Sequence, residues 1–281
     1  MRRTARSLSV RLLGIPLLVA GLVAAAPSPA SAVTTEPIPN SMASIGDSLT
    51  RAFNACGFYV DCPSHSWSTG DNSAVNSHYL RILAKNSAIS GRNFNDAQSG
   101  AKAIDLDGQA TTAVTQGPDY ITILMGANDA CTSTEAGMTS VSTYASQVQA
   151  AMTRLTTNLP TTRIFVSSVP DIKRLWFIGK GSASARTARN SYKICPSMLA
   201  NPTSTLKADV DRRARVQQRV IDFNTQLAQI CAQYVHCKYD GNATFNYQFV
   251  LGQVSGWDYF HPNDSGQNAV ATTTYNAGFG W

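Results

Sequence analysis

The sequence predicts an α/β protein, specifically a three-layer α/β/α sandwich around a mainly parallel sheet. Short and nearly continuous apolar runs have the length and composition of strands that are buried on both faces. Several segments between them place apolar residues three and four positions apart, which is typical of amphipathic helices. Strands that alternate with helices in this way form parallel sheets through right-handed crossovers, with helices covering both faces.

The predicted strands are 41–45, 120–125, 164–169 and 235–239. The first ends at Gly46, the second follows Pro118, and the third is stopped by Pro170. Glycine and proline interrupt regular structure, so these residues mark the strand boundaries. A shorter candidate at 92–97 precedes a glycine-containing loop.

The predicted helices are 74–86, 141–155, a long segment through 212–230, and 265–276. The two clearest carry their apolar residues on one stripe, which would face the sheet. We expect the arginines outside the stripe of the long helix to form a solvated face. The stripes consist of Val141, Tyr144, Val148, Met152 and Leu155, and of Val216, Val220, Phe223, Leu227 and Ile230; the arginines are Arg212, Arg213, Arg215 and Arg219.

The stretch 175–206 fits this alternation poorly, because it has no clean apolar period and holds several Gly, Ser and Ala residues. Long connections in compact domains are often functional or mobile. We therefore expect this stretch to form a rim or lid over a site.

Residues 1–32 have the composition of a secretory signal. An acid-free basic start is followed by the apolar run 12–26 and by Ala30-Ser31-Ala32, small residues at signal-peptidase spacing. The run is shorter than the ~20 apolar residues that span a bilayer. We predict a secreted protein whose mature chain begins at Val33 and whose residues 33–281 form a single domain. The basic residues are Arg2, Arg3, Arg6 and Arg11.

The charge balance argues against a nucleic-acid partner. The chain has 23 Lys and Arg against 17 Asp and Glu, so without the four leader arginines the net charge falls from +6 to +2. Nucleic-acid binding requires a basic patch that releases counterions from phosphates. We expect no nucleic-acid partner and a monomeric protein.

All six cysteines lie in the mature part, and an even number in an oxidising compartment suggests disulfides. Six cysteines allow 15 pairings. Local pairs are entropically easiest to close, which favours Cys56–Cys62 and Cys231–Cys237 and leaves Cys131 with Cys195. No CxxC or HxxxH spacing occurs, so we expect no metal site.

Polar groups follow the apolar runs, at the position where parallel sheets gather reactive side chains. A nucleophilic serine needs a base within hydrogen-bond reach, and that base needs a carboxylate to fix its tautomer. Taken singly, each residue in these groups also has a simpler explanation as a cap or turn residue. The groups are Gly46-Asp47-Ser48-Leu49-Thr50, Ser99-Gly100-Ala101, Gly126-Ala127-Asn128-Asp129 and Asp258-Tyr259-Phe260-His261-Pro262-Asn263.

In this order, the four groups resemble the SGNH hydrolases, also called the GDSL family of esterases and lipases, over about residues 41–268. The resemblance implies a flavodoxin-like sheet and a serine esterase that needs no cofactor. It also implies a catalytic triad of Ser48, His261 and Asp258, with an oxyanion hole formed by Ser48, Gly100 and Asn128. We interpret Asp47 as a turn residue that positions Ser48, and His65, His78 and His236 as structural or surface residues.

The block 66–71 is similar to phospholipase-B-type members, and aromatic residues lie near the predicted site. Both favour lipid acyl esters as substrates, with transient contact to a lipid surface, although the aromatic residues could equally belong to the core. Two alternatives stay open: a carbohydrate O-acetylesterase and a secreted binding protein without turnover. The aromatic residues are Trp176, Phe177, Trp257, Tyr259 and Phe260.

Overall fold

The computed structural model describes residues 37–281, and the predicted signal peptide lies outside the described residues. Five parallel strands form one sheet in the order β2-β1-β3-β4-β5. This is the flavodoxin-like strand order, so the predicted fold class is confirmed. The strands are β1 (Met42–Gly46), β2 (Asn93–Asn95), β3 (Tyr120–Leu124), β4 (Arg163–Val166) and β5 (Cys237–Tyr239).

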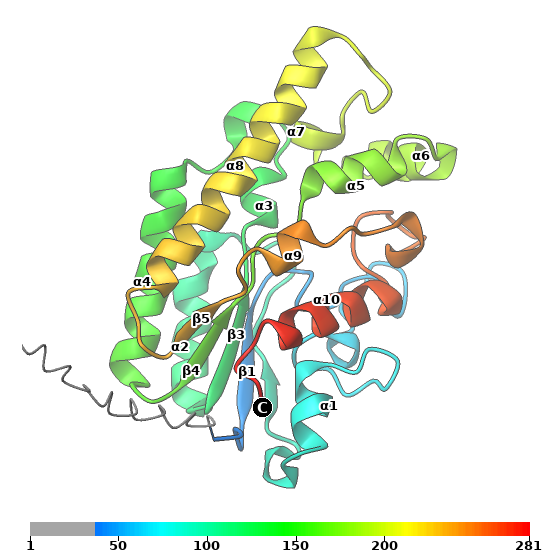
Figure 1. The fold of residues 1–281 in the computed structure, drawn as a ribbon. Coiled ribbons are helices and arrows are strands. Elements are labelled where there is room, and N and C mark those ends of the chain that lie inside the picture. Colours follow the sequence, from blue (N-terminus) through cyan, green and yellow to red (C-terminus); the bar gives the residue numbers. More distant parts are fainter. Residues whose placement is uncertain (1–36) are drawn as a thin grey trace, which may run out of the picture. The chain divides into compact units, whose positions relative to one another are not determined.

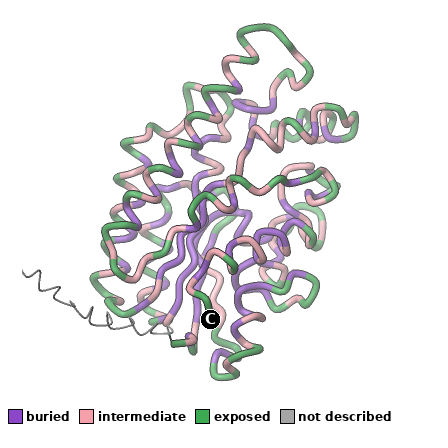
Figure 2. The backbone as a smooth tube through the Cα atoms, in the orientation of Figure 1, coloured by how far each residue is buried: buried purple, intermediate pink, exposed green. Residues whose placement is uncertain are grey.

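The central strands are buried on both faces, as their apolar composition predicts. Every residue of β1 and β3 is buried, and Figure 2 shows the buried strands at the centre of the described part of the chain. Side chains alternate between the two faces along each strand. Ile45 and Ile123 join one core cluster, whereas Met42 and Tyr120 join another on the opposite face.

Helices α2 (Leu106–Gln116), α4 (Val141–Asn158) and α8 (Lys207–Cys231) cover one face of the sheet (Figure 1). Apart from the half-buried Val141, the predicted stripes of α4 and α8 are buried between these helices and the sheet, where the rings of Tyr144 and Phe223 stack at 4.0 Å. Ser140 caps the start of α4 by accepting the amide of Thr143.

Helices α1 (His78–Leu83) and α10 (Asp264–Asn276) cover the opposite face (Figure 1). Between them His78 is fully buried and hydrogen-bonds the hydroxyls of Tyr120 at 2.9 Å and Thr274 at 2.7 Å. Burial lowers the pKa of His78 to about 3, so this histidine is neutral and structural. Asn263 caps α10 by accepting the amide of Gly266.

The stretch 175–206, which we expected to be irregular, is largely helical. It contains most of α5 (Ile172–Gly179), α6 (Ala183–Ser191) and α7 (Pro196–Leu199). These helices lie beyond the carboxyl end of the sheet (Figure 1). Asp171 caps the start of α5, and Ser182 caps the start of α6. Because the sequence of α6 is mostly polar, the stability of this helix depends on tertiary contacts.

Other segments differ from the sequence expectations in extent. The helix expected at 74–86 is only α1, while α2 was not predicted, because its buried face is made mainly of small and polar residues. The strand expected at 164–169 covers only β4. The remaining short elements are α3 (Ala127–Ala130), α9 (Ala243–Asn246) and 3₁₀ turns at Pro63–His65, Ser87–Ile89, Ala103–Asp105, Glu135–Gly137 and Leu251–Gln253.

Of the four arginines of α8 that we expected to form a solvated face, only Arg215 is exposed. Arg213 is buried, donates to the carbonyl of Ser204 and lies over the ring of Trp176. Arg212 donates to the carbonyls of Pro196 and Ala200. Arg215 pairs with Glu135, and Arg219 donates to the carbonyl of Thr139. These side chains connect α8 to the neighbouring loops.

Three disulfides join Cys56 to Cys62, Cys131 to Cys195, and Cys231 to Cys237, which are the pairs expected from the sequence. In the part of the chain that the structure describes, no helix is long and apolar enough to cross a bilayer.

Candidate active site

Ser48 lies in the tight turn that follows β1, because Gly46 and Asp47 shape that turn. Gly46 has φ +153°, and a Cβ there would lie 2.3 Å from the carbonyl oxygen of Leu124. Asp47 Oδ1 accepts the amide of Leu49 at 2.9 Å, which matches the predicted turn role. The backbone of Gly46 is further held by Gln109 of α2, whose amide bonds both its N–H and its carbonyl.

The turn brings Ser48 to His261, which lies 213 residues away in sequence. His261 Nε2 is 2.8 Å from Ser48 Oγ, and His261 Nδ1 is 2.6 Å from Asp258 Oδ2. His261 lies three residues before the start of α10, and Asn263 fixes this junction by donating to the carbonyls of Gly252 and Val254. The structure therefore places all three residues of the predicted triad in one hydrogen-bonded chain.

The Asp258 carboxylate is buried and fully hydrogen-bonded. Its Oδ1 accepts the backbone amides of Phe260 and His261, at 2.8 and 3.1 Å. Burial by itself would raise its pKa, but the hydrogen bonds and the neighbouring His261 outweigh burial and hold the pKa below its usual value. The carboxylate is thus ionised at neutral pH and oriented toward the imidazole.

Gly100 and Asn128, the remaining predicted oxyanion residues, line the same groove as Ser48. Gly100 has φ +84°, a left-handed conformation that favours glycine. Within residues 37–281, neither the amide of Ser48 nor that of Gly100 has a hydrogen-bond acceptor. Asn128 lies on α3 and donates one amide hydrogen to the carbonyl of Ala101, which leaves the other hydrogen free.

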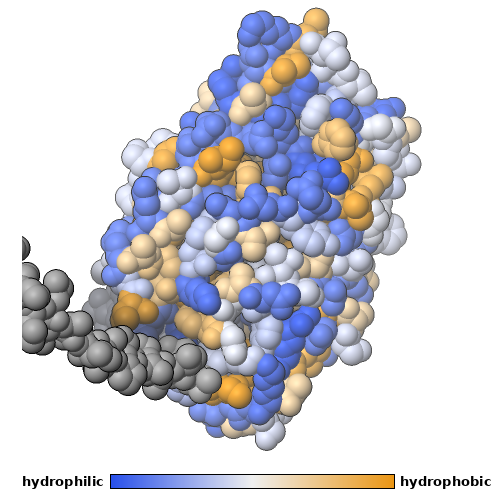
Figure 3. Space-filling model, in the orientation of Figure 1, coloured by the Kyte–Doolittle hydropathy of each residue, from blue (hydrophilic) through white to orange (hydrophobic). Residues whose placement is uncertain are grey.

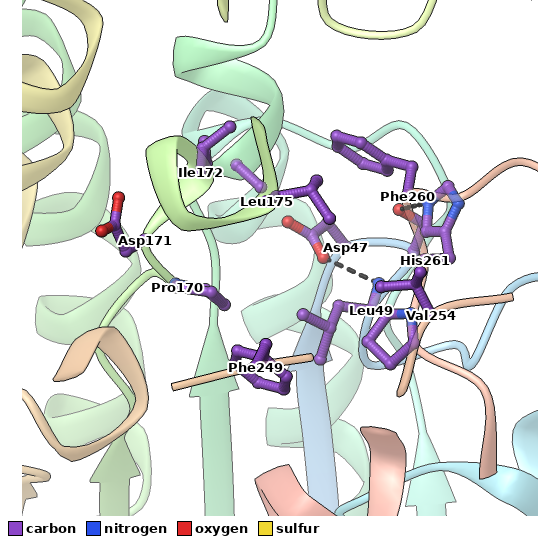
Figure 4. A pocket seen from close by; sticks show the side chains of 13 residues that line it. Asp47, Leu49, Pro170, Asp171, Ile172, Leu175, Phe249, Val254, Phe260 and His261 are labelled. Atoms are coloured by element: carbon purple, nitrogen blue, oxygen red, sulfur yellow. Dashed lines mark hydrogen bonds between the residues drawn. The ribbon is translucent and has the colours of Figure 1, made fainter. Parts of the chain in front are cut away.

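Asp47 carries a second carboxylate close to the nucleophile, but its environment is unlike that of Asp258. It is 1 % exposed, and its Oδ2 has no hydrogen-bond partner among the described residues. Burial raises the pKa of Asp47 to about 6, although the amide of Leu49 and nearby His261 both act to lower it. Figure 4 shows this side chain between Leu49 and Leu175.

Two cavities meet at Ser48 and His261. The first, here called the narrow cavity, has a volume of about 70 Å³ and lies under α5 (Figure 4). Its lining is mostly apolar, and the Asp171 side chain points away from it (Figure 4). The lining includes Leu49, Pro170, Ile172, Leu175, Phe249, Val254, Phe260 and Pro262.

The second cavity, here called the wide groove, has a volume of about 480 Å³ and contains Gly100 and Asn128. Three exposed aromatic side chains line this groove and a fourth, Trp257, packs beside them, and we call the four the aromatic rim. Phe58 lies at their centre, with its ring 5.5 to 6.0 Å from the other three. The aromatic rim consists of Phe58, Tyr59, Tyr192 and Trp257, which are 48, 76, 52 and 53 % exposed.

The other aromatic residues that we singled out have separate roles. Phe260 lines both cavities. Trp176 is half-buried, and the cations of Lys180 and Arg213 both lie over its ring. Phe177 is exposed on α5, where apolar side chains gather on the surface (Figure 3). The block 66–71, which we used to favour lipids, lines neither cavity. Its Ser68 is buried and bonds the hydroxyl of Thr122 in the sheet.

The sequence analysis did not identify three residues that hold the backbone or the carboxylate of the candidate site in place: Asn54, Gln109 and Arg189. Each acts through a hydrogen bond to a residue that is distant in the chain, so no local pattern indicates it. Among the described residues, no group of three or more His, Cys, Asp or Glu side chains could hold a metal ion. His65 pairs with Asp264 near the start of α10, away from both cavities.

A parallel sheet with a Ser–His–Asp chain beyond its strand ends defines a protein of the serine hydrolase type. Residues 42–273 match the model of the GDSL-like Lipase/Acylhydrolase family, and the chain therefore belongs to this family. Its fold is similar to the crystal structure of a GDSL-like lipase from Parabacteroides merdae, with 15% identity and a TM-score of 0.51 over 86% of this chain and 97% of that one.

Phospholipase A1 from Streptomyces albidoflavus is similar with 14% identity and a TM-score of 0.49, over 84% of this chain and 98% of that one. A family 3 carbohydrate esterase from Clostridium thermocellum is similar with 14% identity and a TM-score of 0.47, over 84% of this chain and 93% of that one. No curated protein matches the chain.

Proposed function

We propose that the protein is a secreted serine carboxylic-ester hydrolase that acts on lipid acyl esters through an acyl-enzyme intermediate. The supporting observation is the chain from Asp258 through His261 to Ser48, with bonds of 2.6 and 2.8 Å, beside the backbone amides of Ser48 and Gly100, which have no acceptor among residues 37–281. Three disulfides fit an oxidising compartment. The described residues 37–281 belong to one compact unit, which supports a single mature domain.

In this proposal Ser48 Oγ attacks the ester carbonyl while His261 Nε2 takes its proton. The ionised Asp258 stabilises the resulting imidazolium and keeps Nε2 directed at Ser48. The amides of Ser48 and Gly100 and the side chain of Asn128 stabilise the oxyanion, each worth about 3 kcal/mol of the barrier. His261 then protonates the leaving alkoxide, and water hydrolyses the acyl-enzyme by the same route.

The character of the two cavities supports a lipid substrate. A sugar substrate would require polar side chains that are free to bond hydroxyls. Of the polar side chains that line the wide groove, Asn54, Ser99 and Asp258 already bond other protein groups, and Ser48 and His261 bond each other. The rings of the aromatic rim are tilted by 46 to 53° to Phe58, so they form no flat platform for a sugar ring. Amphipathic aromatic side chains suit contact with a lipid surface.

One observation favours the second candidate, a carbohydrate O-acetylesterase. The narrow cavity of about 70 Å³ is smaller than the ~150 Å³ that accommodates a benzene ring. If the acyl group occupies this cavity, it must be short. Substrate chain length therefore separates the two candidates, whereas covalent labelling separates both from a binding protein without turnover.

The test is a substrate panel of p-nitrophenyl acetate, butyrate and laurate, phosphatidylcholine vesicles and acetylated xylan. We expect hydrolysis of the laurate ester and of phosphatidylcholine, and loss of activity beyond butyrate would overturn the lipid assignment. Ser48→Ala should lower kcat by at least about a thousandfold, while Ser146→Ala, at an exposed serine of α4, should retain wild-type activity. A fluorophosphonate should label the wild type and not Ser48→Ala; a folded wild type that does not label would indicate a binding protein.

A further inference from the structure

We infer that Asn54 is a positioning residue for this reaction, and that its side-chain amide fixes the Asp258 carboxylate against His261. The inference rests on the proposed function, because it assigns to Asn54 a role in the same hydrogen-bonded chain. Asn54 lies six residues after Ser48, in the loop that follows β1.

The geometry of the Asp258 carboxylate carries the inference. Asn54 Nδ2 donates to Asp258 Oδ2 at 2.6 Å, and the same oxygen receives Nδ1 of His261 at 2.6 Å. The other oxygen is held only by backbone amides of the Asp258 loop itself. Among the described residues, Asn54 is thus the one hydrogen-bond donor to this carboxylate from outside residues 258–261.

This bond connects the two halves of the candidate site. The loop after β1 carries Ser48, and the loop before α10 carries Asp258 and His261. Phe53, the neighbour of Asn54, bonds the carbonyl of Ser48 through its amide and packs its ring 5.0 Å from the ring of His261. Asn54 therefore sets where the loop of residues 258–261, here called the acid–base loop, lies relative to Ser48.

The position suits asparagine for a second reason. Asn54 is buried and has φ +61°, a left-handed conformation that asparagine adopts more readily than most residues. Its side-chain Oδ1 accepts the backbone amide of Tyr59 at 2.6 Å, and the backbone amide of Asn54 donates to the carbonyl of Val60. These bonds and the Cys56–Cys62 disulfide hold the loop that presents Nδ2 to Asp258.

We expect loss of the amide to lower kcat without a comparable change in KM. The narrow cavity does not include Asn54 and would keep its shape, and the wide groove, which Asn54 lines, would keep its shape in Asn54→Asp. The carboxylate, however, could rotate away from the geometry that supports the imidazolium. Removal of groups that orient functional side chains typically costs between about tenfold and about a hundredfold in activity. A purely structural role would instead lower the melting temperature and leave kcat of the folded protein unchanged.

Two variants separate these outcomes. Asn54→Gly keeps the left-handed backbone and removes the amide. Asn54→Asp keeps the shape and replaces the donor with a second carboxylate beside Asp258. The matched control is Asn76→Gly, since Asn76 also has a positive φ, of 48°, but is exposed and lines neither cavity.

The measurements are kcat, KM and the pH profile of kcat/KM with a soluble p-nitrophenyl ester, together with melting temperatures. We expect both Asn54 variants to lose kcat, and Asn76→Gly to match the wild type. In Asn54→Asp the acid limb of the profile should move to higher pH, because the added negative charge favours the imidazolium.

Folded Asn54→Gly with wild-type kcat, or Asn54→Asp with an unshifted acid limb, would overturn the inference. Asn54→Asp keeps the test decisive if the glycine variant fails to fold. Ser48→Ala distinguishes the two levels of failure. If it remains active, the proposed function is wrong; if it is inactive while both Asn54 variants behave as wild type, only the positioning role is wrong.

Discussion

Asp47 holds a carboxyl group in surroundings that disfavour its charge. One oxygen bonds the amide of Leu49, while the other is buried without a partner among the described residues. Its pKa rises to about 6 from the ordinary 3.8, mainly because burial penalises the ionised form. The turn that presents Ser48 is therefore built around a group that costs stability when it is ionised.

This raised pKa predicts how stability depends on pH. Between about pH 4 and pH 6 the unfolded chain releases the Asp47 proton while the folded protein retains it. Below pH 4, protonated Asp47 therefore makes its full contribution to the free energy of unfolding. This contribution, roughly 3 kcal/mol, is lost as the pH rises to about 6. Denaturant unfolding from pH 4 to 8 should show this decline in the wild type and not in Asp47→Asn. The control is Asp71→Asn, at an exposed position; an equal decline in Asp47→Asn would contradict the assignment.

Helices α5 and α6 support the acid–base loop, which is why we interpret the stretch 175–206 as the rim of the site. Arg189 of α6 is buried and donates twice to the carbonyl of Tyr259, at 3.0 and 2.6 Å, and once to that of Leu175. Tyr259 lies between Asp258 and His261 in a left-handed conformation, with φ +55°. Burial lowers the pKa of Arg189 to about 10, so the guanidinium remains charged at neutral pH. Gly179 leaves room for it, since a Cβ there would lie 2.1 Å from Arg189 Nη1.

Replacing Arg189 with methionine should weaken both the fold and the reaction. The variant keeps the length of the side chain but leaves the carbonyl of Tyr259 without its donor, at a cost of about 1–3 kcal/mol. We expect a lower melting temperature and a lower kcat, with partial recovery in Arg189→Lys. Arg186→Met on the same helix is the control, because among the described residues the Arg186 side chain bonds only the carbonyl of Lys180. If the folded methionine variant keeps wild-type kcat, α6 does not position the loop.

Across the whole molecule, the disulfides differ in how much chain they enclose. Cys56–Cys62 and Cys231–Cys237 each span 6 residues, whereas Cys131–Cys195 spans 64. The long-range disulfide connects the end of α3, which carries Asn128, to the start of α7 in the stretch 175–206. It therefore joins the oxyanion side of the site to the segment that borders the wide groove.

Chain entropy predicts unequal effects when these bonds are removed. The long loop should contribute about 4 kcal/mol and each short loop about 2 kcal/mol, because a cross-link restricts the unfolded chain more when it closes a longer loop. Denaturant titration of Cys131→Ser/Cys195→Ser and of Cys231→Ser/Cys237→Ser should show this difference in the free energy of unfolding. Equal losses would mean that loop length does not govern their stabilisation.

The sequence predicted those parts of the fold whose signal is local. Strands β1 and β3 are buried on both faces, so their apolar runs and flanking Gly and Pro residues suffice to identify them. Helix α2 was not predicted because it packs through small residues such as Ala110 and Ala113, which form no apolar stripe. Arg213 was expected in solvent, but only the folded chain brings Trp176 and the carbonyl of Ser204 to it.

The same distinction holds for the site. The sequence by itself determined which blocks follow the strands and which types of residue they offer, because the carboxyl ends of parallel strands meet at one edge of a sheet. Only the tertiary structure decided which side chains support them: Asn54 reaches Asp258 across 204 residues, and Arg189 reaches Tyr259 across 70. Such bonds depend on distances in space between loops, and a linear pattern of residues does not record those distances.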